Sequence, residues 1–173
     1  YISLMLFNTA RAEFYMHRHH LDALIATSPV NIPYFTDYTL WIDPLMKEYM
    51  VKPGGSSDIF QGYALCPVEG EPALMSTGAL LAVNAMDIRV KDIRLFGPSG
   101  LDTSLPPGEL PGEALRIYDL LAETPEYTSS SEALAGALAD RGLADGQLGI
   151  EVDGLTPARY EALKELLPHA RWL

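Results

Sequence analysis

Four consecutive apolar residues, Ala23–Ala26 in the segment LDALIATS, place the strongest constraint on how this chain folds. A strand with one solvated face alternates apolar and polar residues, whereas a strand covered on both faces is continuously apolar. The run has the length of a strand and no polar face. It therefore predicts a strand that lies inside an α/β sheet with a layer on each side.

Helical and strand-like patterns alternate along the rest of the chain. Helices are predicted at residues 9–20, around 114–121, after the capping-box pair Ser129 and Glu132, and after Thr156 and Pro157. Residues 29–39 predict a turn or short irregular helix, and 78–86 a short helix. Strands are predicted at 59–68, 72–77, 88–97, 146–154 and 170–173, with a hairpin joining the first two. This alternation predicts an α/β domain with a mixed sheet covered by helices on both faces.

Composition excludes several classes of function. A chain of 173 residues suits one domain with a sizeable core. The net charge of −11 argues against nucleic acid, which is bound by Lys and Arg, and no polybasic segment is present for anionic lipid. No apolar run approaches the roughly 18 residues of a membrane span. The single cysteine, Cys66, is expected to be a buried inert thiol, and the missing disulfide framework favours a cytoplasmic location.

Three histidines within four residues, His17, His19 and His20, raise the question of a metal site. On one helix His17 and His20 share a face, while His19 points elsewhere. A zinc site needs three or four convergent ligands, and the only nearby carboxylate is that of Asp22. We favour a structural role at the negative end of the helix dipole. A metal site, or an autonomous enzyme that uses these histidines, is the weaker alternative.

Known catalytic motifs are missing from the sequence. It contains no phosphate-binding glycine loop, no dinucleotide fingerprint and no nucleophile elbow. Glu69 and Glu71 fall in the hairpin turn, and Glu109 and Glu113 in a proline-rich loop, so solvated surface charge accounts for them. The residues alone predict no catalytic group and no metal ligand in this chain.

The segment LDALIATSPVNIPYFTDYT, which follows a helix carrying Arg11, resembles the start of the creatinase/prolidase/aminopeptidase P family, the pita-bread enzymes. That family begins with a helix, a G-L-D-A-L-L strand and an N-I-x-Y-L-T-G motif. The residues that fit are Asp22, Asn31, Tyr34, Thr36 and Tyr38, whereas Asp37 replaces the usual glycine. The later segment LGIEVDGLTPARYEALKELLPHARWL is similar to the family's G-I-E strand, helix and final strand. Residues 97–128 fit less well and resemble an insertion.

The resemblance implies a six-stranded mixed sheet with ribonuclease-H-like topology for a single domain over 1–173. It also implies that the chemistry lies elsewhere. In metal-dependent members two Asp, one His and two Glu bind two metal ions in a separate carboxy-terminal domain, which is expected to begin beyond Leu173. None of those ligands can be assigned in this chain, so a divalent metal (Mn, Co or Zn) is expected only in that domain.

Three functions compete at this point. The first is the non-catalytic amino-terminal domain of a creatinase/prolidase-type hydrolase, a Xaa-Pro aminopeptidase or dipeptidase, which serves dimerisation and closes the substrate pocket. Its partners would be its own catalytic domain and a second copy of the protein, in the cytoplasm. The second is a free-standing domain that binds a ligand or protein without catalysis. The third is the histidine enzyme considered above.

The segment 37–62 holds the candidates for a pocket or interface, because it is longer than most connections in compact domains. These candidates are Trp41, Phe60, Tyr38 and Asp37. The aromatic side chains either cap the sheet's own core or belong to an arm that packs on a second subunit. In creatinase an aromatic residue and an arginine from this region face the neighbour's substrate. Here Phe60 could match the aromatic residue, but Gln61 stands near the expected place of the arginine, which counts against creatine as substrate.

Overall fold

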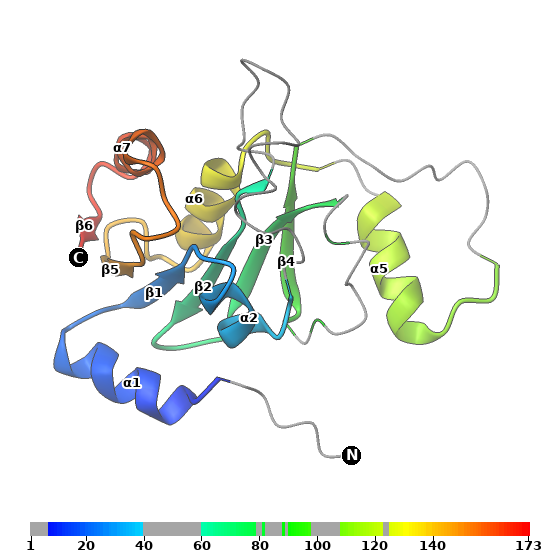
Figure 1. The fold of residues 1–173 in the computed structure, drawn as a ribbon, viewed down its shortest axis with the longest axis horizontal. Coiled ribbons are helices and arrows are strands. Elements are labelled where there is room, and N and C mark those ends of the chain that lie inside the picture. Colours follow the sequence, from blue (N-terminus) through cyan, green and yellow to red (C-terminus); the bar gives the residue numbers. More distant parts are fainter. Residues whose placement is uncertain are drawn as a thin grey trace.

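The computed structural model describes residues 7–39, 60–78, 81, 88, 90–97, 108–122 and 125–173 (Figure 1). Its helices are α1 (Thr9–Arg18), α2 (Asn31–Thr36), α5 (Gly112–Ala122), α6 (Ser130–Asp140) and α7 (Pro157–Leu166). Its strands are β1 (Ala23–Ala26), β2 (Tyr63–Pro67), β3 (Ala73–Thr77), β4 (Asp92–Phe96), β5 (Gln147–Ile150) and β6 (Arg171–Trp172). Most of the predicted helix at 78–86 lies outside the described residues, as do Trp41 and most of the segments 37–62 and 97–112.

The strands form one six-stranded mixed sheet in the order β4-β3-β2-β1-β5-β6. Strand β2 runs antiparallel to both β1 and β3, and the other neighbouring pairs are parallel. The predicted buried strand, β1, lies inside the sheet and pairs with β5, with Ala23 opposite Leu148 and Ile25 opposite Ile150. The predicted mixed sheet with ribonuclease-H-like order is therefore confirmed.

Both faces of the sheet are covered, as the continuous apolar run in β1 predicts. Because alternate side chains point to opposite faces, Ala23 and Ile25 join a core cluster with α6 and α7, while Ala26 joins a cluster with α2 and α5. A third cluster places Phe7 and Met16 against Cys66 and thus holds α1 near the sheet. Helices cover opposite sides of the sheet in Figure 1.

Local signals fixed several helix ends. The Ser129 side chain accepts a hydrogen bond from the Glu132 N–H at 3.2 Å and caps α6, as predicted. Glu132 reaches back one residue further than a capping box requires and accepts from the Thr128 N–H at 2.9 Å. Thr156 caps α7 with Pro157 in its first turn. Gly142 ends α6 in the left-handed region, with φ 68°.

Helix α1 ends two residues earlier than its sequence pattern predicts. The helix stops at Arg18, and His20 adopts a left-handed conformation with φ 56°. The Leu21 N–H then donates to the Met16 carbonyl at 2.8 Å, which closes the helix in the manner usually given to glycine. His17 and His20 therefore do not share a helical face. Among the described residues, no helix is long and apolar enough to span a membrane.

Strand boundaries also differ from the sequence pattern. Strand β4 begins at Asp92 rather than at residue 88, and β5 ends at Ile150 rather than at residue 154. Backbone pairing with β1 continues one residue beyond β5, since the Glu151 N–H donates to the Ile25 carbonyl at 3.0 Å. The Glu151 side chain binds the turn after β1, as described below. Gly154 then passes so close to Thr27 that an added Cβ would lie 2.5 Å from its carbonyl oxygen.

Candidate functional site

The ends of β1 and β5 meet at the carboxylate of Glu151. Its Oε2 accepts hydrogen bonds from the backbone N–H groups of Thr27 at 2.8 Å and Ser28 at 2.9 Å. Its Oε1 accepts from the Ser28 hydroxyl and the Asn31 side-chain amide, both at 2.6 Å. The Thr27 hydroxyl donates to the Glu151 carbonyl at 2.7 Å. One side chain thus fixes both the turn after β1 and the start of α2.

The protonation state of Glu151 follows from this geometry. Partial burial raises the pKa of the carboxyl group, but the hydrogen bonds from Ser28, Thr27 and Asn31 outweigh burial and hold the pKa below its usual range. The carboxylate is therefore ionised at neutral pH. With four donors around its two oxygens it serves as a structural clamp and has no proton to give to a reaction.

A buried amide lies beside this clamp. Gln61 is 1% exposed and donates from Nε2 to the carbonyl of Thr27 at 3.2 Å and to that of Gly62 at 2.9 Å. Its Oε1 accepts from Arg159 of α7 at 2.8 Å. The sequence contains no arginine between Arg18 and Arg89, yet the fold brings a guanidinium from the far end of the chain to Gln61. The spacing of residues along the chain gave no sign of this contact.

A hollow of about 350 Å³ opens between β1, β5 and α2. Its floor is the sheet at Leu24, Ala26 and Gly149, and its walls include Tyr34 and Phe35 of α2. Glu151 and Asn31 supply its polar corner. An apolar recess with a few fixed polar groups is the usual form of a binding site.

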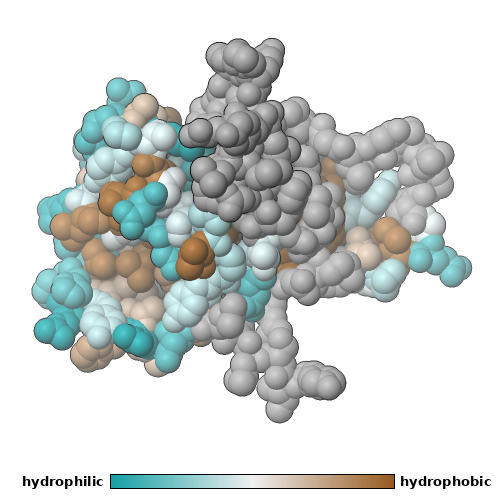
Figure 2. All heavy atoms as spheres, in the orientation of Figure 1, coloured by the Kyte–Doolittle hydropathy of each residue, from teal (hydrophilic) through white to brown (hydrophobic). Residues whose placement is uncertain are grey.

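Large apolar side chains are exposed around this hollow and on α1. Val30 is 77% exposed, Val152 56% and Phe14 60%. Figure 2 shows hydrophobic surface interrupting the polar surface over the part of the molecule that holds β1, β5 and β6. Exposed apolar side chains beside a hollow give a surface that another protein or domain can contact.

The predicted pocket residues fall into different places. Tyr38 is 1% exposed and lies in the core cluster of α2 and α5, and the half-buried Phe60 packs against the same cluster. Burial raises the pKa of Tyr38 to about 12, although the Ser76 side chain opposes the rise. Asp37 ends α2 with φ 58°, in the left-handed region. The structure thus brings Tyr38 and Phe60 together in one cluster and gives Asp37 the position of the helix-ending glycine.

The histidines and the cysteine show no arrangement for chemistry. Among the described residues, no group of three His, Cys, Asp or Glu side chains is placed to hold a metal ion. Burial, and secondarily the charge of Glu13, raises the pKa of the Cys66 thiol to about 12. A thiol with that pKa is protonated at neutral pH and is a poor nucleophile.

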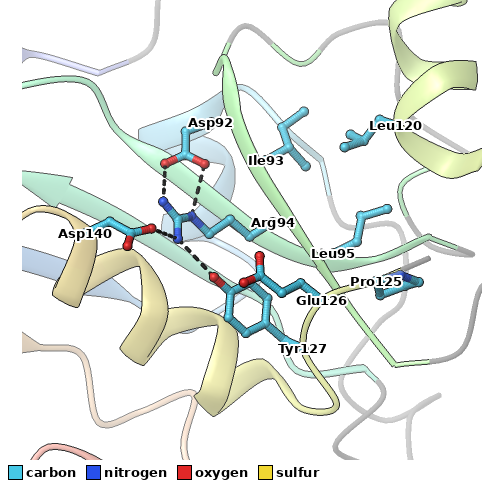
Figure 3. A pocket seen from close by; sticks show the side chains of 9 residues that line it. All are labelled: Asp92, Ile93, Arg94, Leu95, Leu120, Pro125, Glu126, Tyr127 and Asp140. Atoms are coloured by element: carbon cyan, nitrogen blue, oxygen red, sulfur yellow. Dashed lines mark hydrogen bonds and ion pairs between the residues drawn. The ribbon is translucent and has the colours of Figure 1, made fainter. Parts of the chain in front are cut away.

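A second polar cluster lies at the β4 end of the sheet (Figure 3). Arg94 binds both carboxylate oxygens of Asp92, at 3.1 and 3.2 Å, and also reaches Asp140 at 2.6 Å. Arg141 joins Asp92 from α6 at 2.6 Å, and the Tyr127 hydroxyl lies 3.1 Å from Arg94. Burial raises the pKa of Asp92, but the two guanidinium groups outweigh it and keep the pKa below its usual range. The cluster joins β4 to α6.

Sequence reasoning missed most of these residues. Asn31 and the G-I-E segment were recognised as family-like patterns, but their contact across the fold was not predicted. The conformation of Asp37 could have been predicted from the sequence. The family motif has a glycine at this place, directly after a short helix, and a residue there is expected in the left-handed region. The sequence gives no such indication for Asp92, Arg94 and Arg141, because their spacing does not show which of them pair.

Comparison with known proteins shows the fold. No protein-family model and no curated protein matches the chain. A proline dipeptidase from Streptococcus pneumoniae is 14% identical with a TM-score of 0.56, over 96% of this chain and 89% of that chain. The creatinase/prolidase N-terminal domain of an X-Pro dipeptidase from Streptococcus pyogenes is 13% identical with a TM-score of 0.52, over 95% and 90%.

A longer protein contains the same fold as one part. The X-Pro aminopeptidase from Thermotoga maritima is 9% identical with a TM-score of 0.57, and the match covers 96% of this chain but 33% of that chain. At these identities the likeness shows the fold, and the chain has the fold of the creatinase/prolidase N-terminal domain. The fold that the sequence resemblance implied is thereby confirmed.

Proposed function

We propose that this chain is the non-catalytic amino-terminal domain of a creatinase/prolidase-type hydrolase, a Xaa-Pro aminopeptidase or dipeptidase. The observation that carries the proposal is the fold match over nearly the whole chain to domains of proteins named as proline dipeptidases and X-Pro aminopeptidases. The working location proposed for the parent protein is the cytoplasm.

The reaction itself belongs outside this domain. A two-metal hydrolase needs several carboxylates that clamp both ions, and the described residues offer no group of three metal-binding side chains. The described residues therefore do not fit the divalent metal that the family uses. In the proposal Mn, Co or Zn is held by the carboxy-terminal catalytic domain.

The apolar hollow supports a role in assembly. Its floor at β1 and β5 and its exposed neighbours Val30 and Val152 give a surface that another domain can cover. The proposed occupants are the catalytic domain of the same chain and, across a homodimer, that of a second copy. The segment 37–62, with Trp41 and Phe60, would then close the substrate pocket of the neighbouring subunit.

The test compares the isolated domain with the full-length protein. Both are assayed with proline dipeptides and longer Xaa-Pro peptides, with Mn²⁺, Co²⁺ or Zn²⁺ added. We expect turnover only for the full-length protein. Activity of the isolated domain that disappears in a His17→Ala, His19→Ala, His20→Ala triple variant would instead support the histidine enzyme.

Pocket closure is tested with Trp41→Ala and Phe60→Ala in the full-length protein. If the segment lines a neighbour's pocket, each variant raises KM or lowers kcat while circular dichroism shows an intact fold. Leu115→Ala, which removes an exposed apolar side chain of α5 outside the hollow, is the matched control. If both variants unfold the isolated domain and leave the kinetics of the surviving enzyme unchanged, the aromatic side chains serve only the core.

A free-standing binding domain is the second candidate. The hollow of about 350 Å³, with Asn31 and Glu151 at its polar corner, is the observation that favours it. The coding sequence beyond residue 173 separates the two candidates. A long continuation with spaced Asp, Asp, His, Glu and Glu supports the hydrolase, and a stop codon supports the binding domain.

A further inference from the structure

The sequence contains two aspartate–glycine pairs, Asp145–Gly146 directly before β5 and Asp153–Gly154 shortly after it. In such a pair the glycine nitrogen can attack the aspartate side chain that precedes it, because no Cβ shields that nitrogen. Both aspartates are exposed. Exposure therefore does not distinguish the two pairs, whereas the hydrogen bonds of each glycine do.

The backbone of Gly146 is held at both of its polar groups. Its N–H donates to the Leu143 carbonyl at 3.0 Å, and its carbonyl accepts from the Arg171 N–H at 2.9 Å. The Gly146 nitrogen can turn toward the Asp145 side chain only after these hydrogen bonds open. The fold thus protects the first pair.

The turn around Gly154 leaves the corresponding nitrogen free. The Leu155 N–H donates to the Val152 carbonyl at 3.0 Å, which places Asp153 and Gly154 at the centre of a β-turn. Within the part of the chain that the structure describes, neither the Gly154 N–H nor the Asp153 carboxylate has a hydrogen-bonding or ionic partner. No such contact has to break before the two groups meet.

Packing also requires a glycine at position 154. An added Cβ would lie 2.5 Å from the carbonyl oxygen of Thr27. The backbone N–H of Thr27 is bound by Glu151 at 2.8 Å, so its position is fixed by the contact that joins β1 to β5. The second pair therefore combines an unbonded amide with a glycine that the fold cannot exchange for a larger residue.

From these observations we propose that Asp153 is a site of spontaneous isoaspartate formation, and that Asp145 is protected from it. The Gly154 nitrogen bonds to the side-chain Cγ of Asp153 and loses its proton, while one carboxyl oxygen leaves as water. Water then opens the cyclic imide. Opening at Cγ restores aspartate, whereas opening at the main-chain carbonyl carbon leaves the chain running through Cβ and Cγ. Water is the sole co-reactant, and the proposal does not depend on the proposed hydrolase.

The product lengthens the main chain by one carbon between Glu151, which binds the turn after β1, and Thr156, which caps α7. Gly154 has no room to move toward Thr27, so the added carbon has to distort the turn. Leu155, the last residue of that turn, packs against the core cluster of α6 and α7. We therefore expect the isomerised chain to be less stable than the original.

Both aspartates lie in one tryptic peptide, residues 142–159, so each is an internal control for the other. The 173-residue chain is incubated at physiological pH and temperature and digested. Fragmentation in a mass spectrometer and loss of cleavage by an aspartate-specific protease then locate isoaspartate. We expect it to accumulate about tenfold faster at Asp153 than at Asp145, because the hydrogen bonds of Gly146 must open first.

Unfolding in urea should remove this difference, so that both positions react at similar rates. Equal rates in the folded chain would overturn the proposal. Isoaspartate that forms at Asp153 only in urea would overturn it as well.

Asp153→Glu tests the consequence for the fold. It keeps the charge but lengthens the side chain, which disfavours ring closure, so position 153 should no longer isomerise. The melting temperature of the unmodified chain should fall with incubation time, and that of Asp153→Glu should stay constant. Asp145→Glu is the matched control and should behave as the unmodified chain does. An equal fall in Asp153→Glu would assign the loss to another reaction and overturn the effect proposed for the turn.

Discussion

At the junction of β1 and β5 the carboxylate of Glu151 accepts hydrogen bonds from uncharged groups, whereas at β4 the carboxylate of Asp92 is shared by two guanidinium groups. The first cluster joins residues 124 positions apart, such as Thr27 and Glu151. The second joins β4 to α6. Uncharged donors with short distances fix the backbone at one point, while the strength of ion pairs also depends on salt. The hydrogen bonds around Glu151 therefore fix the backbone where β1 and β5 end. The ion pairs around Asp92 hold the edge strand β4 against α6.

The largest effect is expected at the first cluster. Glu151→Ala should lower the free energy of unfolding by about 3 kcal/mol, because the donors on Thr27, Ser28 and Asn31 lose a charged acceptor. Urea unfolding near neutral pH measures the change. Glu165→Ala on α7 is the matched control and should stay within about 0.5 kcal/mol. A loss below about 1 kcal/mol for Glu151→Ala would mean that water molecules satisfy these hydrogen-bond donors nearly as well as the carboxylate does.

The second cluster depends on a close contact between Gly136 and Tyr127. A Cβ at Gly136 would lie 2.5 Å from the Tyr127 hydroxyl oxygen and 2.7 Å from its ring. Gly136→Ala should therefore displace the ring from Arg94 and destabilise the domain by about 1–2 kcal/mol.

A double-mutant cycle checks the cause of this loss. With Tyr127→Ala already present, Gly136→Ala should stabilise α6 by up to about 1 kcal/mol through helix propensity. The sign of the Gly136→Ala effect should therefore reverse. If it stays destabilising without the ring, the contact with Tyr127 is not its origin.

An effect of similar size is expected where α2, which the first cluster positions, comes to its end. Asp37 has φ 58°, which a β-branched residue adopts only with strain. Asp37→Val should be less stable than Asp37→Gly by about 1–2 kcal/mol in thermal unfolding. Both variants remove the same side-chain interactions, so the difference isolates the backbone. Equal melting temperatures would show that the backbone at Asp37 relaxes.

The smallest effects concern pH, to which both clusters respond, and salt, which separates them. Both Glu151 and Asp92 have a pKa below the usual range in the folded state. Their stabilisation is present above the unfolded carboxyl pKa of about 4 and is lost as pH falls through the folded pKa. In Glu151→Gln the loss of stability with falling pH should be smaller, because residue 151 no longer titrates.

Salt should act on the other cluster. Raising NaCl from about 0.1 M to about 1 M should reduce the contribution of Asp92 by up to about 0.5 kcal/mol, because the exposed part of its ion-pair network is screened. The contribution of Glu151, measured as the difference between the unmodified chain and Glu151→Gln, should barely change. Equal salt dependence of the two clusters would remove the distinction drawn between them.

The sequence predicts the parts of this structure that depend on neighbouring residues. The apolar run at β1 predicted a strand covered on both faces, and Ser129 and Thr156 predicted helix caps, because each signal acts within a few residues. Gly142, which ends α6 in the left-handed region, is likewise a local signal. The end of α1 was misplaced because His20, which is not a glycine, adopts the left-handed conformation.

The candidate site was harder to predict, because its contacts join distant segments. Nothing in the spacing of Asn31 and Glu151 shows that their side chains meet, and nothing near Gln61 points to Arg159. The one indication of the contact between Asn31 and Glu151 was that both lie in segments that resemble the same family, since such segments often pack against each other. Trp41 lies outside the described residues and stays a prediction.

The pairing of β1 with β5 has a consequence for how the chain folds during synthesis. Strand β1 emerges early, but its parallel partner follows more than 120 residues later, as the contact between Thr27 and Glu151 shows. Closing so long a loop is slow, whereas the hairpin β2–β3 needs only a short turn. While the ribosome adds the intervening residues, one edge of β1 has no partner strand, because β5 and Glu151 have not yet been synthesised. Until β5 is synthesised, the apolar strand β1 is prone to aggregate. A chaperone bound to the nascent chain would protect it.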